Sequence, residues 1–154
     1  MNPELLRQAI EQAAENVCRG GGPFAALVVK DGAVIAAGFN RVTACNDPTA
    51  HAEIVAIREA CRVLGGFQLT GCDVYCSCEP CPMCLGALFW ARPARIFFAA
   101  SAADAAASGF DDSFICRQLA LPQAARAIPM IHVTDQSAQR PFEEWAARPD
   151  KVRY

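Results

Sequence analysis

The sequence predicts an α/β protein, a three-layer α/β/α sandwich with a mixed five-stranded sheet. Two observations lead to this fold class. Two apolar segments joined by Asp31-Gly32 have the pattern of an antiparallel hairpin with a tight turn. Farther along the chain, strand-like and helical segments alternate, which favours parallel pairing of the strands. A sheet that contains both kinds of pairing is mixed, and helices on its two faces complete three layers.

The order of elements follows from apolar periodicity and from residues that begin and end helices. Apolar side chains three and four residues apart over 3–17 predict a first helix, ended by Gly20-Gly21-Gly22-Pro23. Asp47 and Pro48 favour a helix start, with the aspartate as cap and the proline in the first turn. The expected order is helix 3–17, strands 24–30 and 33–39, loop 40–46, helix 47–64, strand 72–77, helix 80–92, strand 94–100, helix 101–108, strand 128–134 and helix 141–147.

Length and composition favour one domain over residues 1–154, with 135–154 as a C-terminal helix and tail. A chain of 154 residues is long enough to bury a core without disulfides. Its 53% hydrophobic and 19% charged residues are typical of a packed globular protein. The longest apolar stretches, such as 93–103, are shorter than the roughly 20 residues that cross a bilayer, so no membrane partner is expected.

Charge and cysteine content indicate a small-molecule enzyme of a reducing compartment. The formal net charge of −2 provides no electrostatic attraction for a polyanion, so we expect a small neutral substrate and no nucleic acid. The nine cysteines are an odd number and cluster between Cys72 and Cys84, which favours metal binding over disulfides. With no export signal at the start, we expect a cytoplasmic protein.

Three side chains have the identity and spacing of ligands for a catalytic zinc ion. Cys81 and Cys84 are three residues apart at an expected helix start, where they share a face and the helix dipole favours thiolates. His51 supplies a third ligand, and three protein ligands leave a fourth position for water. The sequence therefore predicts one Zn2+ ion per chain, held by these three residues.

Glu53 is expected to be the catalytic proton carrier beside that ion. Zinc lowers the pKa of bound water to about 7, and a neighbouring carboxylate takes up the proton and later returns it. Residues two apart in an ideal helix point roughly 200° apart. His51 and Glu53 therefore face one pocket only if their helix approaches it end-on.

A closed zinc site in a non-catalytic interaction module is the alternative of another class. It would combine the two ligand cysteines with Cys72, Cys76 or Cys78. Cys76 and Cys78 fall near the end of an apolar strand, where cysteine commonly behaves as a small buried hydrophobe. A closed site also gives no role to the histidine and the glutamate, so the catalytic site is favoured.

The chain carries the H-x-E and P-C-x-x-C segments known from zinc deaminases, as His51-Ala52-Glu53 and Pro80-Cys81-Pro82-Met83-Cys84. Beyond these segments, it resembles bacterial guanine deaminases of the cytidine-deaminase-like superfamily over nearly its whole length. The other segments that carry the resemblance are 21–24, 46–50, 77–79, 85–87, 90–93 and 109–114, with a C-terminal tyrosine at Tyr154.

The resemblance implies hydrolytic deamination of guanine to xanthine and ammonia, with Glu53 and Asp112 as catalytic residues. Asn40 would hydrogen-bond the purine and Phe24 would pack on its ring, since guanine has polar edges and flat apolar faces. The residues expected to contact the substrate are Phe24, Asn40, Ala52, Trp90 and Tyr154. The resemblance also implies a homodimer that exchanges its C-terminal segments, with the tail at 135–154 closing over the active site.

Each substrate contact has a structural alternative. Asn40 can simply shape the turn after the hairpin, where asparagine is common. Phe24 and Trp90, taken singly, are more typical of a core than of a pocket. Asp111 is expected to cap the helix that starts near Ser113, which leaves Asp112 as the catalytic member of the pair.

Two other enzymatic functions share the metal motif. A tRNA adenosine deaminase has the same size, fold and motif, but it must bind a phosphate backbone, for which an acidic chain is poorly suited. Deamination of another amino-heterocycle, such as cytosine or an amino-triazine, differs only in pocket details. The metal motif therefore predicts hydrolytic deamination, and the prediction of guanine as the substrate depends on the segments outside the motif.

Overall fold

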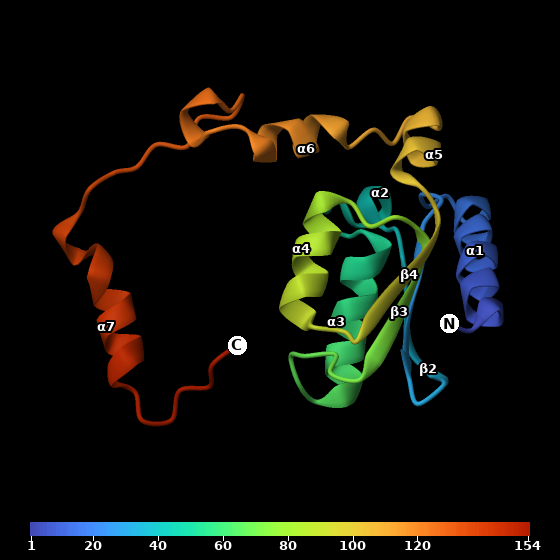
Figure 1. Ribbon diagram of the computed structural model, residues 1–154, viewed down its shortest axis with the longest axis horizontal. Coiled ribbons are helices and arrows are strands. Elements are labelled where there is room, and N and C mark those ends of the chain that lie inside the picture. The colour runs from blue at the N-terminus through green and yellow to red at the C-terminus, as the bar shows by residue number, and fades with distance from the viewer. The chain divides into compact units, whose positions relative to one another are not determined.

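The computed structural model describes residues 1–154, which divide into two units, Met1–Ser113 and Phe114–Tyr154. The first unit contains the sheet and the helices packed on it (Figure 1). Its elements are α1 (Pro3–Cys18), β1 (Ala25–Lys30), β2 (Ala33–Phe39), α2 (Val42–Cys45), α3 (Ala52–Leu64), β3 (Cys72–Cys78), α4 (Pro82–Ala91), β4 (Arg95–Ala100) and α5 (Ala102–Ala107). α6 (Ser113–Ala120) begins at the boundary between the two units. The second unit also contains α7 (Arg140–Ala147) and 3-10 turns at Gln123–Ala125 and Gln136–Gln139.

The sheet is mixed, as predicted, and has the strand order β2-β1-β3-β4. β1 pairs antiparallel with β2 and with β3, while β3 and β4 run parallel. The parallel pair is joined through α4, as expected for a strand-helix-strand unit. β2 and β4 are the two edge strands.

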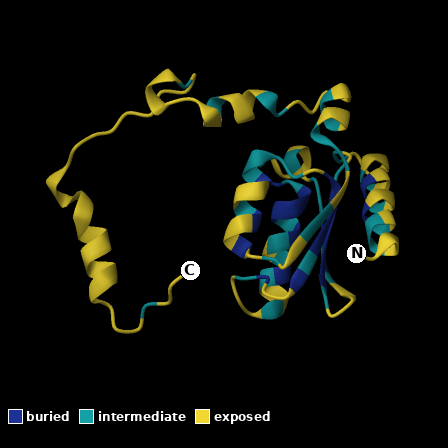
Figure 2. Ribbon diagram, viewed as in Figure 1, coloured by how far each residue is buried: buried dark blue, intermediate teal, exposed yellow.

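Two hydrophobic clusters, one on each face of the sheet, confirm the three-layer sandwich. In β1, Ala26 and Val28 belong to the cluster under α3 and α4, whereas Leu27 and Val29 belong to the cluster under α1. A strand covered on both faces is apolar at successive positions, because alternate side chains point to opposite faces. Figure 2 shows this burial concentrated on the strands and on the sheet-facing sides of the helices.

The prediction of a fifth strand at 128–134 is wrong, since the sheet has four strands. The segment has no regular secondary structure, and Ile128, Ile131 and Val133 are exposed. Strand-like composition does not make a strand unless the backbone pairs with a neighbour, and the second unit contains no sheet. This unit also has no buried residue and so lacks a core of its own.

The start of α3 differs from the prediction at Asp47-Pro48. Asp47 accepts hydrogen bonds at Oδ1 from the backbone N–H and the hydroxyl of Thr49, at 2.8 and 2.7 Å. These bonds form a local turn, so the helix begins only at Ala52, with His51 as its N-cap in extended conformation. The expected loop at 40–46 contains the short helix α2. None of the helices is long and apolar enough to span a bilayer.

Gly38 allows β2 to pack closely against the first turns of α3. A Cβ atom at this position would collide with the backbone oxygen of Ala52 and the backbone nitrogen of Ala56. Both obstacles are main-chain atoms of a packed helix, which cannot move aside like the end of a flexible side chain. The small residue therefore sets how closely α3, and with it His51, approaches the sheet.

We expect Gly38→Ala to lower the free energy of unfolding by about 1–3 kcal/mol, because the added methyl group overpacks the contact between strand and helix. Denaturant unfolding measures the change. Gly66→Ala is the matched control, since a Cβ there meets nothing within 4 Å and its φ is not in the left-handed region. Equal stability of the two variants would show that the sheet does not constrain α3 in this way.

Candidate metal centre

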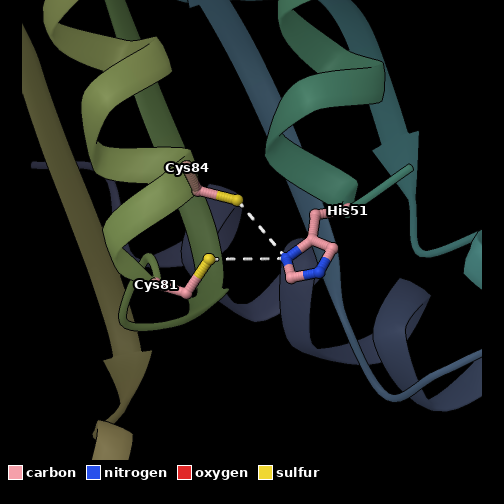
Figure 3. Close-up of side chains that lie close together, drawn as sticks. All are labelled: His51, Cys81 and Cys84. Carbon is pink, nitrogen blue, oxygen red and sulfur yellow. Dashed lines mark hydrogen bonds between the residues drawn. The ribbon is translucent and has the colours of Figure 1, made fainter. Parts of the chain in front are cut away.

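The amino-terminal ends of α3 and α4 meet and bring three possible metal ligands together. His51 is the N-cap of α3 and Cys81 the N-cap of α4, and both have extended backbone, with ψ of 156° and 167°. Neither side chain caps its own helix. Both point instead toward the space between the helices, together with Cys84 from the first turn of α4 (Figure 3).

The spacing of the ligand atoms fits a zinc ion. The Sγ atoms of Cys81 and Cys84 each lie 3.5 Å from Nδ1 of His51, and all three ligand atoms lie within 4.8 Å of one another. Tetrahedral zinc with ordinary Zn–S and Zn–N bonds holds a sulfur and a nitrogen about 3.6 Å apart. One nitrogen and two sulfurs are also the donor types that zinc prefers, and a fourth position remains for water.

Glu53 faces the same space from the first turn of α3. Its Oε2 atom lies 3.4 Å from Sγ of Cys84, and only 8% of the residue is exposed. The angle of roughly 200° between residues two apart holds only within a helix. Because His51 is outside the helix in extended conformation, its ring and the Glu53 carboxylate address one site, as the end-on arrangement requires.

The electrostatics of the centre favour a thiolate next to a buried carboxyl group. The hydrogen bond from Cys84 lowers the pKa of Cys81 to about 4, with a further contribution from His51. The hydrogen bond with Cys81 raises the pKa of His51. The hydrogen bond that Cys84 shares with Cys81 raises the pKa of Cys84, and burial adds to this effect. Burial raises the pKa of Glu53. A carboxyl group with a raised pKa is suited to exchanging protons near neutral pH.

The other cysteines of the cluster do not belong to the ligand group. Cys72, Cys76 and Cys78 are buried in β3, and the group that can hold an ion consists of His51, Cys81 and Cys84. Cys78 instead donates a hydrogen bond of 3.6 Å to the backbone oxygen of Ser101. The geometry gives no support to the closed cysteine-rich site.

The other predicted site residues occupy different parts of the chain. Phe24 precedes β1 and packs edge-to-face on Phe110, with ring centroids 5.0 Å apart. Asn40 directly follows β2 and is half-buried, and Ala52 is buried at the start of α3. Trp90 lies at the carboxyl end of α4, roughly 13 Å along the helix from Cys81. The structure does not bring Trp90 to the metal ligands of its own chain.

The two aspartates near the end of the first unit differ in burial, Asp111 being exposed. Asp111 accepts a hydrogen bond of 2.8 Å at Oδ1 from the backbone N–H of Ser113, which confirms its local structural role. Asp112 is half-buried. Tyr154 belongs to the second unit and is 72% exposed.

Two contacts near the site were not anticipated from the sequence. The carboxylate of Glu79 accepts a hydrogen bond of 3.0 Å from the backbone N–H of Ala102, which ties the turn before Cys81 to the end of β4. Asn16 of α1 donates its amide to the backbone oxygen of Asn40 at 3.0 Å. Both partners are remote in sequence, so periodicity and spacing carry no signal of either contact.

Comparison with known proteins identifies the family. Residues 2–100 match the family model of the cytidine and deoxycytidylate deaminase zinc-binding region. The chain therefore belongs to this family of zinc-dependent deaminases, and its His51, Cys81 and Cys84 form the candidate zinc site.

Within the family, the chain is a homologue of a bacterial guanine deaminase, which confirms the resemblance. It is 54% identical to guanine deaminase of Bacillus subtilis over 100% of both chains. The crystal structure of that enzyme matches with a TM-score of 0.97, covering 100% of this chain and 99% of the other. Guanine deaminase from Nitrosomonas europaea matches with a TM-score of 0.68 and 36% identity, over 70% of this chain and 63% of the other. The tRNA-specific adenosine deaminase of Aquifex aeolicus is 42% identical, but over only 62% of this chain and 64% of its own.

Removing one ligand is expected to remove the metal. His51→Ala and Cys81→Ser should each contain well below one zinc per chain, because two remaining ligands hold the ion poorly. Metal analysis of the dialysed proteins measures the content. Cys45→Ser is the matched control, as an exposed cysteine outside the ligand group, and should retain about one zinc per chain. Full zinc content in both ligand variants would refute the assignment of this centre.

Proposed function

We propose that this chain deaminates guanine hydrolytically to xanthine and ammonia in purine catabolism or salvage. The observation that carries the proposal is the extent of the similarity. The match to guanine deaminase covers the whole chain, whereas the match to the tRNA deaminase covers 62%. The match to the guanine enzyme therefore extends beyond the metal motif, over the segment around Asp112 and the tail. Because the ligand thiolates are stable under reducing conditions, we place the reaction in the cytoplasm.

Glu53 is the proposed proton carrier. Zinc supplies Lewis acidity that activates a water molecule for attack on an electron-poor carbon. The Glu53 carboxylate accepts the proton of that water and delivers it to the substrate as the C2–O bond forms. The second proton of the water passes from the new C2 hydroxyl to the exocyclic amine, which leaves as ammonia when the C2–N bond breaks and the C2 carbonyl forms. Burial of Glu53 limits exchange of these protons with bulk water.

Asn40 and Phe24 are the proposed contacts of the purine. The Oδ1 atom of Asn40 accepts a hydrogen bond of 3.3 Å from the backbone N–H of Val42, which leaves the amide Nδ2 group to donate to a ring nitrogen or carbonyl oxygen. The Phe24 ring is braced edge-to-face by Phe110 and offers a flat apolar surface for stacking. Ala52 lines the pocket, and Asp112 assists proton transfer at the leaving amine.

We further propose a homodimer that exchanges its C-terminal segments. β4 is an edge strand whose Phe98 is 47% exposed, and the segment 128–134 has strand-like composition but no partner strand. Docking of this apolar segment against β4 of a second copy buries apolar surface on both sides. The same exchange brings Tyr154 to a neighbouring site, where the tail 135–154 closes over the substrate and meets exposed residues such as Trp90.

The decisive experiment measures ammonia release from guanine, adenine, cytosine, guanosine, a melamine-type amino-triazine and an anticodon stem-loop. We expect turnover of guanine above all others, and Glu53→Gln should retain zinc while lowering kcat by about 10²-fold, the usual loss of a general base. Glu11→Gln, on the exposed side of α1, is the control for loss of one carboxylate. Inosine formation in the stem-loop without guanine turnover would favour the tRNA enzyme, and an active Glu53→Gln would refute the proton-carrier role.

Deletion of residues 149–154 tests the tail. The shortened chain is expected to retain its zinc, because every ligand lies in the first unit, while kcat/KM for guanine falls by about tenfold or more through loss of closure. Steady-state kinetics and light scattering of the full chain and the deletion separate closure from dimer formation. Unchanged kinetics would remove the tail from the active site, and a monomeric full chain would refute the exchange.

A further inference from the structure

Asn16 joins three segments of the first unit through one side chain and its own backbone. Its amide Nδ2 donates hydrogen bonds to the backbone oxygens of Gly22 and Asn40, at 2.8 and 3.0 Å. Its backbone oxygen accepts a hydrogen bond of 2.9 Å from the N–H of Gly21. The last turn of α1, the glycine loop and the residue that follows β2 are thereby held together.

The two glycines of the loop are packed against this arrangement. A Cβ atom on Gly21 would collide with the Asn16 amide, at 2.7 Å from Cγ and 2.8 Å from Oδ1. A Cβ atom on Gly22 would lie 3.0 Å from Cγ and Oδ1 of Asn40. Neither glycine has room for a side chain, because the side chains of Asn16 and Asn40 occupy the space beside them. The glycine loop and the two asparagines therefore fit together as one unit.

Three of the four hydrogen-bonding groups of Asn40 are occupied by contacts within the first unit. Its backbone N–H donates to the Phe24 oxygen at 3.1 Å, its backbone oxygen accepts from Asn16, and its Oδ1 accepts from Val42. Only the Nδ2 group of Asn40 is left to bind substrate. A residue whose backbone is held by two hydrogen bonds and whose side chain is held by a third loses little conformational entropy on binding, which favours affinity.

We propose that Asn16 is a positioning residue for substrate recognition, which acts by holding Asn40 and the adjoining Phe24 segment in the orientation that binds the base. This inference rests on the proposed role of Asn40 in purine binding. Asn16 belongs to α1, on the face of the sheet opposite α3 and α4, and it makes no contact with His51, Cys81 or Cys84. Its loss should therefore weaken binding of the base and leave the metal centre intact.

Asn16→Asp is the most informative substitution, because it keeps the shape of the side chain and replaces the donor by an acceptor that faces two carbonyl oxygens. We expect KM for guanine to rise about tenfold, while kcat changes by less than about threefold and zinc content stays at one per chain. Glu11→Gln in the same helix should leave KM unchanged. Gly21→Ala should raise KM similarly, because its methyl group displaces the Asn16 amide, and it serves as the test if Asn16→Asp does not fold.

A double-mutant cycle with Asn40→Ala separates positioning from a general structural role. If Asn16 acts through the Asn40 side chain, Asn16→Asp should have little further effect on KM in the Asn40→Ala background. Equal effects in both backgrounds, an unchanged KM, or loss of zinc would overturn the inference. Should the unmodified chain act on another base of the panel and not on guanine, the guanine assignment fails, while KM for that base still tests Asn16.

Discussion

The whole centre depends on the meeting of two helix amino termini. His51 and Cys81 both occupy the N-cap position, where a polar side chain ordinarily binds the exposed N–H groups of its helix. In this protein neither side chain caps its helix, and both are directed to the shared ligand site. The positive ends of the two helix dipoles then lie at the ligand site, where they stabilise the negative charge of the Cys81 thiolate.

The sandwich fixes where those helix ends lie. α3 follows β2 and α4 follows β3, and both helices cover one face of the sheet. Because β2 and β3 run in the same direction, both helices start at the carboxyl ends of these strands. The close contact at Gly38 fixes the distance between α3 and the sheet. The hydrogen bond that Glu79 accepts from the Ala102 N–H holds the turn before Cys81 in place. A ligand set that spans 33 residues of sequence is thus rigid because each of its ends is anchored to the sheet.

The sequence predicted those parts of the molecule that depend on local chemistry. The ligands, the neighbouring carboxylate, the hairpin and the strand-helix units follow from residue type and spacing, and the zinc ligand group has the predicted members. The start of α3 was predicted four residues early, because the side chain of Asp47 can cap a helix or close a turn with Thr49, and the choice depends on tertiary packing. The segment 128–134 was assigned to the sheet on composition, yet pairing is a property of two strands and not of one.

Chemistry and specificity are therefore encoded in different ways. The metal centre uses side chains at fixed spacing, which many deaminases share and which a single sequence reveals. In the proposed function, recognition of the base depends on the placement of Asn40. Its backbone is bonded to Phe24 and to the amide of Asn16, and its side-chain Oδ1 accepts from the Val42 N–H. Such contacts leave few traces in residue types, apart from glycines where space is lacking. With the proposed role of Asn40, we expect a change of substrate to involve the glycine loop and the residues after β2, and to leave the zinc site as it is.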